Sequence, residues 1–122
     1  MLAVSNNPLV LEHAKETGHP VEGTPLDVLY KVLELLATGE YKLLAHPIAG
    51  NERLLRNPFR TVLLDFSGPP GEQPLSQQLA YVNRALYKME QIDYSSTPPN
   101  TLEDYRAVDY QLYLGALPPL AG

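Results

Sequence analysis

Hydrophobic and polar positions in the first part of the chain alternate in short blocks. Residues 2–4 form an apolar run that Ser5-Asn6-Asn7-Pro8 stops, and apolar residues at helical spacing follow this turn. Asn7 is a favourable N-cap, and Pro8 occupies the first helical position, where its missing N–H costs little. Residues 19–23 then favour a second, very short strand. The pattern therefore predicts a strand, a tight turn, a short helix and a second strand.

Two longer segments carry strong helical periodicity. The first begins at Thr24-Pro25, which again combines a cap with a first-turn proline, and Gly39 follows its end as a C′ glycine. Its wide apolar face favours packing on a sheet, with partial cover from neighbouring elements. The second spans residues 75–89, and its apolar stripe consists of Leu75, Leu79, Val82, Leu86 and Met89.

Residues 41–45 and 61–66 complete the set of expected strands, with a short helix at 51–56 between them. The second of these strands is almost continuously apolar, which is typical of a strand buried on both faces. Strands that alternate with helices imply right-handed crossovers and a parallel arrangement. We therefore expect an α/β fold: a small three- to four-stranded, mostly parallel sheet with helices on both faces.

The C-terminal part of the chain is organised differently. Residues 93–100 are polar and proline-rich, which marks them as a connector between an α/β core at 1–92 and a C-terminal helix and tail at 101–122. We expect this last part to pack either on the core or on a partner subunit, within a single domain overall. The apolar face expected for the last helix consists of Tyr105, Val108, Leu112 and Tyr113.

Composition narrows the function classes. The chain of 122 residues has no cysteine, which excludes a disulfide framework, a thiolate nucleophile, cysteine-ligated zinc and an iron–sulfur cluster. Its net charge of −5 argues against general nucleic-acid binding, because such proteins normally carry a basic surplus. No apolar run approaches the length of a membrane span, and residues 1–4 are too short for a signal peptide. We expect a cytoplasmic protein without nucleic-acid or membrane partners.

Cofactor and metal motifs are also missing from the sequence. Neither a Gly-x-Gly-x-x-Gly pattern nor a phosphate-loop motif occurs, and the three histidines lie at spacings that do not suit a metal site. Glu22 and Asp65 are a candidate pair of carboxylates, although Asp65 is equally suited to face an arginine. We therefore expect neither a cofactor nor a metal ion.

Polar residues that follow the expected strands give a candidate site, because ligands of open α/β sheets bind outside the carboxyl ends of the strands. Ser5, Asn6 and Asn7 follow the first strand, where amide groups and the N-terminus of the next helix attract anions. The alternative is that the asparagines only form a turn and a cap. His46 follows a later strand. It is either an acid–base or ligand-donor group, or a histidine that hydrogen-bonds to loop backbone.

A basic cluster lies between the last two expected strands: Arg53, Arg56 and Arg60 are three of the nine basic residues. Arginine binds carboxylate or phosphate through two parallel N–H groups, so this cluster suggests anion recognition. The alternative is a solvated face, or salt bridges to acidic neighbours. In a parallel sheet Arg60 would start the last strand at the end away from the candidate site. We therefore prefer Arg53 as the anion-binding residue.

Five short segments, in order along nearly the whole chain, carry a resemblance to a known family. They are Ser5-Asn6-Asn7-Pro8, Val21-Glu22-Gly23, His46-Pro47, Asn57-Pro58-Phe59-Arg60 and Leu102-Glu103-Asp104-Tyr105-Arg106. Together they resemble GrdX, a small protein whose gene accompanies glycine, sarcosine and betaine reductase genes in anaerobic bacteria. Ser5 stands where the family is expected to have threonine, and it keeps the hydroxyl. The resemblance implies an accessory role beside a reductase system and no particular mechanism.

Our leading hypothesis is therefore a non-enzymatic accessory or binding protein. It binds a small anionic ligand or a reductase component at the strand-end crevice, through Ser5, Asn6, Asn7, His46 and Arg53. One alternative is a small enzyme that uses His46 as its acid–base on an anionic substrate. Another is a structural oligomer, such as a homodimer, built through the C-terminal helix.

Overall fold

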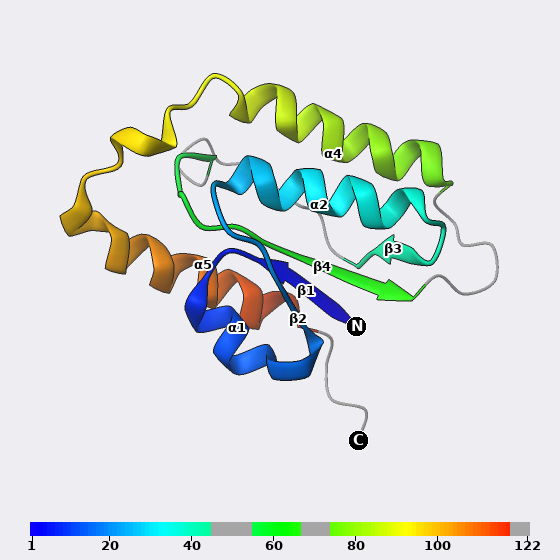
Figure 1. The fold of residues 1–122 in the computed structure, drawn as a ribbon, viewed down its shortest axis with the longest axis horizontal. Helices are drawn as coiled ribbons and strands as arrows, with labels where there is room; N and C mark the ends of the chain where they lie inside the picture. The colour runs from blue at the N-terminus through cyan, green and yellow to red at the C-terminus, as the bar shows by residue number, and fades with distance from the viewer. Residues whose placement is uncertain (45–54, 67–73, 118–122) are drawn as a thin grey trace.

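The computed structural model describes residues 1–44, 55–66 and 74–117, and within these residues a four-stranded sheet lies between two layers of helices (Figure 1). The strands are β1 (Leu2–Ser5), β2 (Gly18–Pro20), β3 (Tyr41–Leu43) and β4 (Thr61–Phe66), in the order β2-β1-β4-β3. The α2–α4 layer on one face consists of α2 (Pro25–Ala37) and α4 (Leu75–Met89). The α1–α5 layer on the other face consists of α1 (Pro8–Ala14) and α5 (Leu102–Ala116).

The strand directions correct the expectation of a mostly parallel sheet. The strand number and the helices on both faces agree with the prediction, but β4 is antiparallel to both of its neighbours, and the parallel pair is β1 with β2. A parallel return from β3 to β4 would need a long crossover, usually a helix. The helix expected at 51–56 was the candidate for that crossover, and most of it lies outside the described residues. The pairing itself is antiparallel, with Leu43 opposite Leu64 and Tyr41 opposite Phe66.

Local signals place the longer helices close to their expected positions. Thr24 and Asp27 form a capping box at the start of α2, where Asp27 Oδ2 accepts a hydrogen bond from the backbone N–H of Thr24 at 2.8 Å. Gly39 follows this helix with a φ of 80°, which favours glycine. The bounds of α4 agree with the predicted spacing. By contrast, α1 ends early, because Lys15 leaves the helical conformation with a φ of 53°.

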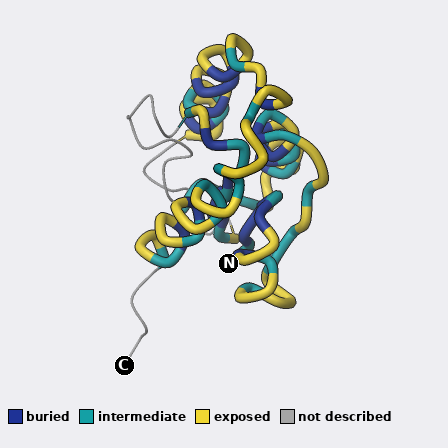
Figure 2. Tube along the Cα trace, turned by 90° about the vertical axis from the view of Figure 1, so that its left-hand side faces the viewer, coloured by how far each residue is buried: buried dark blue, intermediate teal, exposed yellow. Residues whose placement is uncertain are grey.

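Alternate residues of the central strands face opposite layers and build two separate cores. The first core lies under the α2–α4 layer and contains the buried residues Val4, Val28, Leu29, Val32, Leu36, Val62, Leu64, Val82, Ala85, Leu86, Met89 and Tyr94. The second core lies under the α1–α5 layer and contains the buried residues Ala3, Val10, Leu63 and Tyr113. Figure 2 shows buried and exposed positions alternating along the helices, as one-sided packing requires.

The packed face of the last helix agrees only in part with the predicted one. Tyr113 is buried as predicted, whereas Val108 and Leu112 are 42% and 45% exposed and Asp109 is buried. The helix contacts α1 and β4 of its own chain. The prediction for Val108 and Leu112 was wrong because a carboxylate occupies a central buried position, where the hydrophobic pattern requires an apolar residue.

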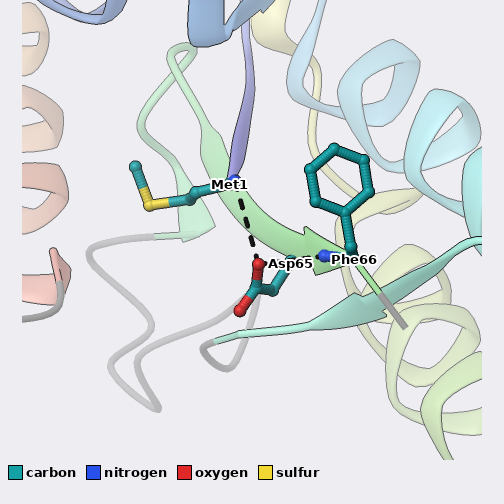
Figure 3. Close-up of polar contacts among 3 residues, drawn as sticks. All are labelled: Met1, Asp65 and Phe66. Atoms are coloured by element: carbon teal, nitrogen blue, oxygen red, sulfur yellow. Dashed lines mark hydrogen bonds and ion pairs between the residues drawn. The ribbon is translucent and has the colours of Figure 1, made fainter. Parts of the chain in front are cut away.

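At the far end of the sheet, where β1 begins and β4 ends, Asp65 lies beside the start of the chain (Figure 3). Its Oδ1 is 3.8 Å from the amino group of Met1 and accepts a hydrogen bond from the backbone N–H of Phe66 at 2.9 Å. Glu22 follows β2 at the opposite end of the sheet. The candidate carboxylate pair of Glu22 and Asp65 is therefore wrong, because the antiparallel direction of β4 carries Asp65 away.

Candidate functional site

The antiparallel pairing of β1 and β4 brings two distant parts of the sequence to one end of the sheet. Ser5, at the carboxyl end of β1, pairs with Thr61, at the start of β4. Arg60 therefore lies at the candidate site, and the expectation that it would lie at the opposite end was wrong. We call the polar residues gathered here the strand-end cluster: Ser5, Asn6, Asn7, Asn57, Arg60, Thr61, Arg106 and Asp109.

Asn6 joins three segments of the chain at this end. Its Nδ2 donates to the carbonyl oxygens of Gly23 at 3.0 Å and Pro58 at 2.8 Å. Its Oδ1 accepts a hydrogen bond from the backbone N–H of Arg60 at 2.8 Å. Both amide N–H groups and the carbonyl oxygen of the side chain are therefore engaged. This arrangement fixes the segments that follow β2 and precede β4 relative to β1.

Asn7 caps α1 as predicted and also holds α5. Its Oδ1 accepts a hydrogen bond from the backbone N–H of Leu9 at 3.1 Å, which is the expected cap. Its Nδ2 donates to the carbonyl oxygen of Arg106 and to Asp109 Oδ2, both at 2.9 Å. The side chain is fully buried. One asparagine thus satisfies a helix start and fastens a second helix that lies about a hundred positions away in the sequence.

A chain of hydroxyl groups ends at the buried carboxylate of Asp109. Thr61 Oγ1 donates to Asp109 Oδ2 at 2.8 Å. The hydroxyl of Thr61 has only one proton, so Ser5 Oγ donates to Thr61 Oγ1, at 2.8 Å. Ser5 Oγ in turn accepts a hydrogen bond from the backbone N–H of Asn7 at 2.9 Å. These bonds align successive donors toward the carboxylate, and they use the hydroxyl protons of both side chains.

Three titratable groups at this end are shifted by burial. Burial raises the pKa of Asp109, and the hydrogen bonds from Asn7 and Thr61 and the charge of Arg60 oppose this rise. Burial also lowers the pKa of Arg60, against the influence of Tyr94 and Asp109. The pKa of Tyr94 is raised by its burial and is lowered in part by Arg60. The arginine and the carboxylate therefore stabilise each other's charge inside the protein.

Arg106 presents a guanidinium group that an aromatic ring positions. Its Cζ lies 5.2 Å from the centroid of the Phe59 ring, within range of a cation–π interaction. Phe59 is held in turn, because its backbone N–H donates to Asn57 Oδ1 and Asn57 Nδ2 donates to the carbonyl oxygen of Tyr105, both at 2.9 Å. Within residues 1–44, 55–66 and 74–117, the Arg106 side chain makes no ion pair, and its buried Nε has no hydrogen-bond partner.

Of the five residues predicted for ligand binding, the structure places Ser5, Asn6 and Asn7 together in the strand-end cluster. His46 and Arg53 lie outside the described residues, so their roles stay predictions. Sequence reasoning missed Arg106 and Asp109. The segment Leu102-Glu103-Asp104-Tyr105-Arg106 was one of those carrying the family resemblance, and this was the available signal for Arg106. For Asp109 the sequence offered no comparable signal.

The arrangement offers guanidinium N–H groups, which are hydrogen-bond donors that suit the oxygens of an anion. Asparagine side chains fix the loops around them. In the described part of the chain, no group of three or more histidine, aspartate or glutamate residues is placed to hold a metal ion. None of the helices in these described residues combines the length and the apolar character that a membrane span requires.

Comparison with known proteins identifies one family. The model of the family described as GrdX-like protein matches residues 2–118 of the chain. No curated protein and no solved structure matches the chain significantly.

Proposed function

The chain belongs to the GrdX-like family, and we propose that it is a non-catalytic accessory protein of a glycine reductase system that binds a small anion at the strand end of its sheet. The family supports the association with a reductase. The strand-end cluster supports the binding of an anion. A reductase component that presents a carboxylate at the same place is the second occupant that this proposal allows.

The observation that carries the proposal is the guanidinium of Arg106, which stacks on Phe59 and has no carboxylate partner among the described residues. Arginine N–H groups match the geometry of carboxylate and phosphate oxygens, and charged hydrogen bonds of this kind are the stronger ones. Arg60 adds a second positive charge, and Asp109 is the one carboxylate of the cluster. The cluster thus contains two arginines and one carboxylate in a protein whose net charge is −5.

The loops at this end are ordered by the protein's own hydrogen bonds, which also favours binding. Asn6 fixes the segment before β4, and Asn57 fixes the position of Phe59. A site that is already ordered loses less conformational entropy when a ligand binds. His46 and Arg53 stay part of the proposal as predicted contributors from the sequence.

The non-catalytic assignment rests on the chemistry of the side chains. The chain has no cysteine and so supplies no thiol for redox work beside a reductase. The hydroxyl protons of Ser5 and Thr61 are used within the chain of bonds that ends at Asp109. These groups support positioning and recognition better than nucleophilic attack. Ligand handling, assembly or regulation is therefore the role that we propose.

Titration calorimetry with acetate, glycine and phosphate tests the proposal on the full chain. We expect at least one of these anions to bind, and Arg106→Met to weaken its affinity about tenfold or more, because a hydrogen bond to a charged group is worth about 1.5–3 kcal/mol. Arg84→Met is the matched control, since Arg84 is exposed on α4 and its removal changes the net charge equally. Equal weakening in both variants, or no binding of any of the three anions, would contradict the proposal.

A further inference from the structure

We infer that an anion bound at Arg106 fastens α5 to the sheet, so that occupancy of the site controls how often this helix detaches. The inference rests on the proposed function and adds a regulatory consequence to it. Arg106 belongs to α5, whereas the ring beneath its guanidinium belongs to the segment that leads into β4. Detachment of the helix would therefore separate the guanidinium of Arg106 from the ring of Phe59.

The contacts of α5 favour its detachment independently of the rest of the domain. The helix makes polar contacts through the carbonyl oxygens of Tyr105 and Arg106 and the carboxylate of Asp109. Its apolar attachment is the small second core, to which it contributes the buried Tyr113 and the partly buried Tyr110 and Leu114. A helix held by few buried apolar contacts opens at a lower free energy than the whole domain unfolds.

A further contact at the other end of the helix is also polar. The hydroxyl of Tyr113 lies 2.8 Å from Nδ1 of His13 on α1, and the His13 ring meets the rings of Tyr113 and Tyr110 edge to face. Opening α5 exposes these groups to water, which can satisfy their hydrogen bonds. The cost of opening is therefore modest compared with exposing an apolar core.

The α2–α4 layer provides an internal reference. Its helices pack on each other and on the first core, and the twelve buried residues of that core include none from α5. A ligand that favours the attached position of α5 should therefore leave the local opening of α4 unchanged. This separation makes the inference distinguishable from general stabilisation by a ligand.

The expected size of the effect follows from mass action. A ligand that binds only when α5 is attached lowers the equilibrium constant for its opening by the factor 1 + [L]/Kd. At a ligand concentration ten times Kd, this factor is about eleven. Amide hydrogens that exchange through this opening should therefore exchange about tenfold more slowly.

Native-state hydrogen exchange of the full chain, followed by peptide-resolved mass spectrometry, tests the inference. Each of the three anions that binds in the calorimeter is added in a separate experiment at ten times its measured Kd, so that a carboxylate ligand is distinguished from a phosphate ligand. We expect about tenfold slower exchange in α5 and no change in α4. The slowing should disappear in Arg106→Met and persist in Arg84→Met, with both variants folded by circular dichroism.

The outcomes separate this inference from the proposed function. Binding in the calorimeter without slower exchange in α5 would overturn the inference and leave the proposed function standing. Equal slowing in α4 and α5 would also overturn it, because it would mean that α5 opens only when the whole chain unfolds. Absence of binding for all three anions contradicts the proposed function itself.

Discussion

The two helical layers cover the same sheet by different physical means. The α2–α4 layer buries a continuous apolar core, in which Leu29, Leu36 and Met89 are fully inaccessible to solvent. The α1–α5 layer buries few apolar residues and relies on hydrogen bonds to Asn7, Asn57 and Asp109. Apolar burial is non-directional and contributes most of the stability, whereas hydrogen bonds contribute less and fix geometry. We conclude that one layer holds the fold together and the other positions the candidate site.

The largest effect expected from this comparison is the loss of a core leucine from the α2–α4 layer. Leu29→Ala should lower the free energy of unfolding by about 3 kcal/mol, because it removes buried methyl groups and leaves a cavity. Urea denaturation checks this value. The matched control is Leu112→Ala on α5, which should cost less than about 0.5 kcal/mol because that side chain is 45% exposed.

An equal loss of stability in the two variants would contradict the division between the layers. It would mean that Leu112 is covered in solution, for example by a second copy of the chain. The homodimer through the C-terminal helix, one of the hypotheses from the sequence, would then gain support. Sedimentation of the wild-type protein at several concentrations shows whether such a dimer forms.

A smaller effect is expected from Asp109, the buried carboxylate of the α1–α5 layer, because its titration makes the free energy of unfolding depend on pH. Burial raises the pKa of Asp109, so the folded protein holds this proton more tightly than the unfolded chain. This contribution to stability is complete below the unfolded pKa and is lost as the pH rises through the folded pKa. Asp109→Asn cannot titrate at this position. The stability of the wild type relative to this variant should therefore fall as the pH rises.

Urea denaturation of both proteins from about pH 4 to about pH 8 measures this difference. All other titratable groups are common to the two proteins, so their contributions largely cancel in the comparison. Asparagine keeps an acceptor oxygen for the donors of Asn7 and Thr61, which limits the structural change. A constant difference across the pH range, or a wild type that gains relative stability toward neutral pH, would show that burial does not control the titration of Asp109.

The features that sequence alone predicted are those set by neighbouring residues. Asn7 and Pro8 mark the start of α1, and Thr24 and Pro25 mark the start of α2 in the same way. The apolar spacing of residues 75–89 places α4 because its period depends only on the helix itself. Such local signals need no knowledge of how the chain is arranged in space.

The features that sequence did not predict depend on contacts between distant segments. The direction of β4 was wrong, and this error alone moved Arg60 to the wrong end of the sheet. Asp109 has its partner Asn7 at a separation of 102 positions, so no local pattern could indicate that a carboxylate is buried on α5. The turn and the cap were one of the two roles expected for the asparagines, but the sequence did not indicate that their amides also connect distant segments of the protein.

The smallest effect, and the one opposite in sign, concerns the turn that leaves α1. Lys15 is exposed and has φ and ψ values of 53° and −117°, a conformation that glycine adopts freely and other residues adopt at a cost. Lys15→Gly should therefore raise the free energy of unfolding by about 1 kcal/mol. Lys15→Ala is the control, because it removes the charged side chain and keeps the Cβ atom that causes the strain. If the glycine and alanine variants have equal stabilities in thermal denaturation, the turn at Lys15 is unstrained. The difference between the two layers then rests only on how each layer packs on the sheet.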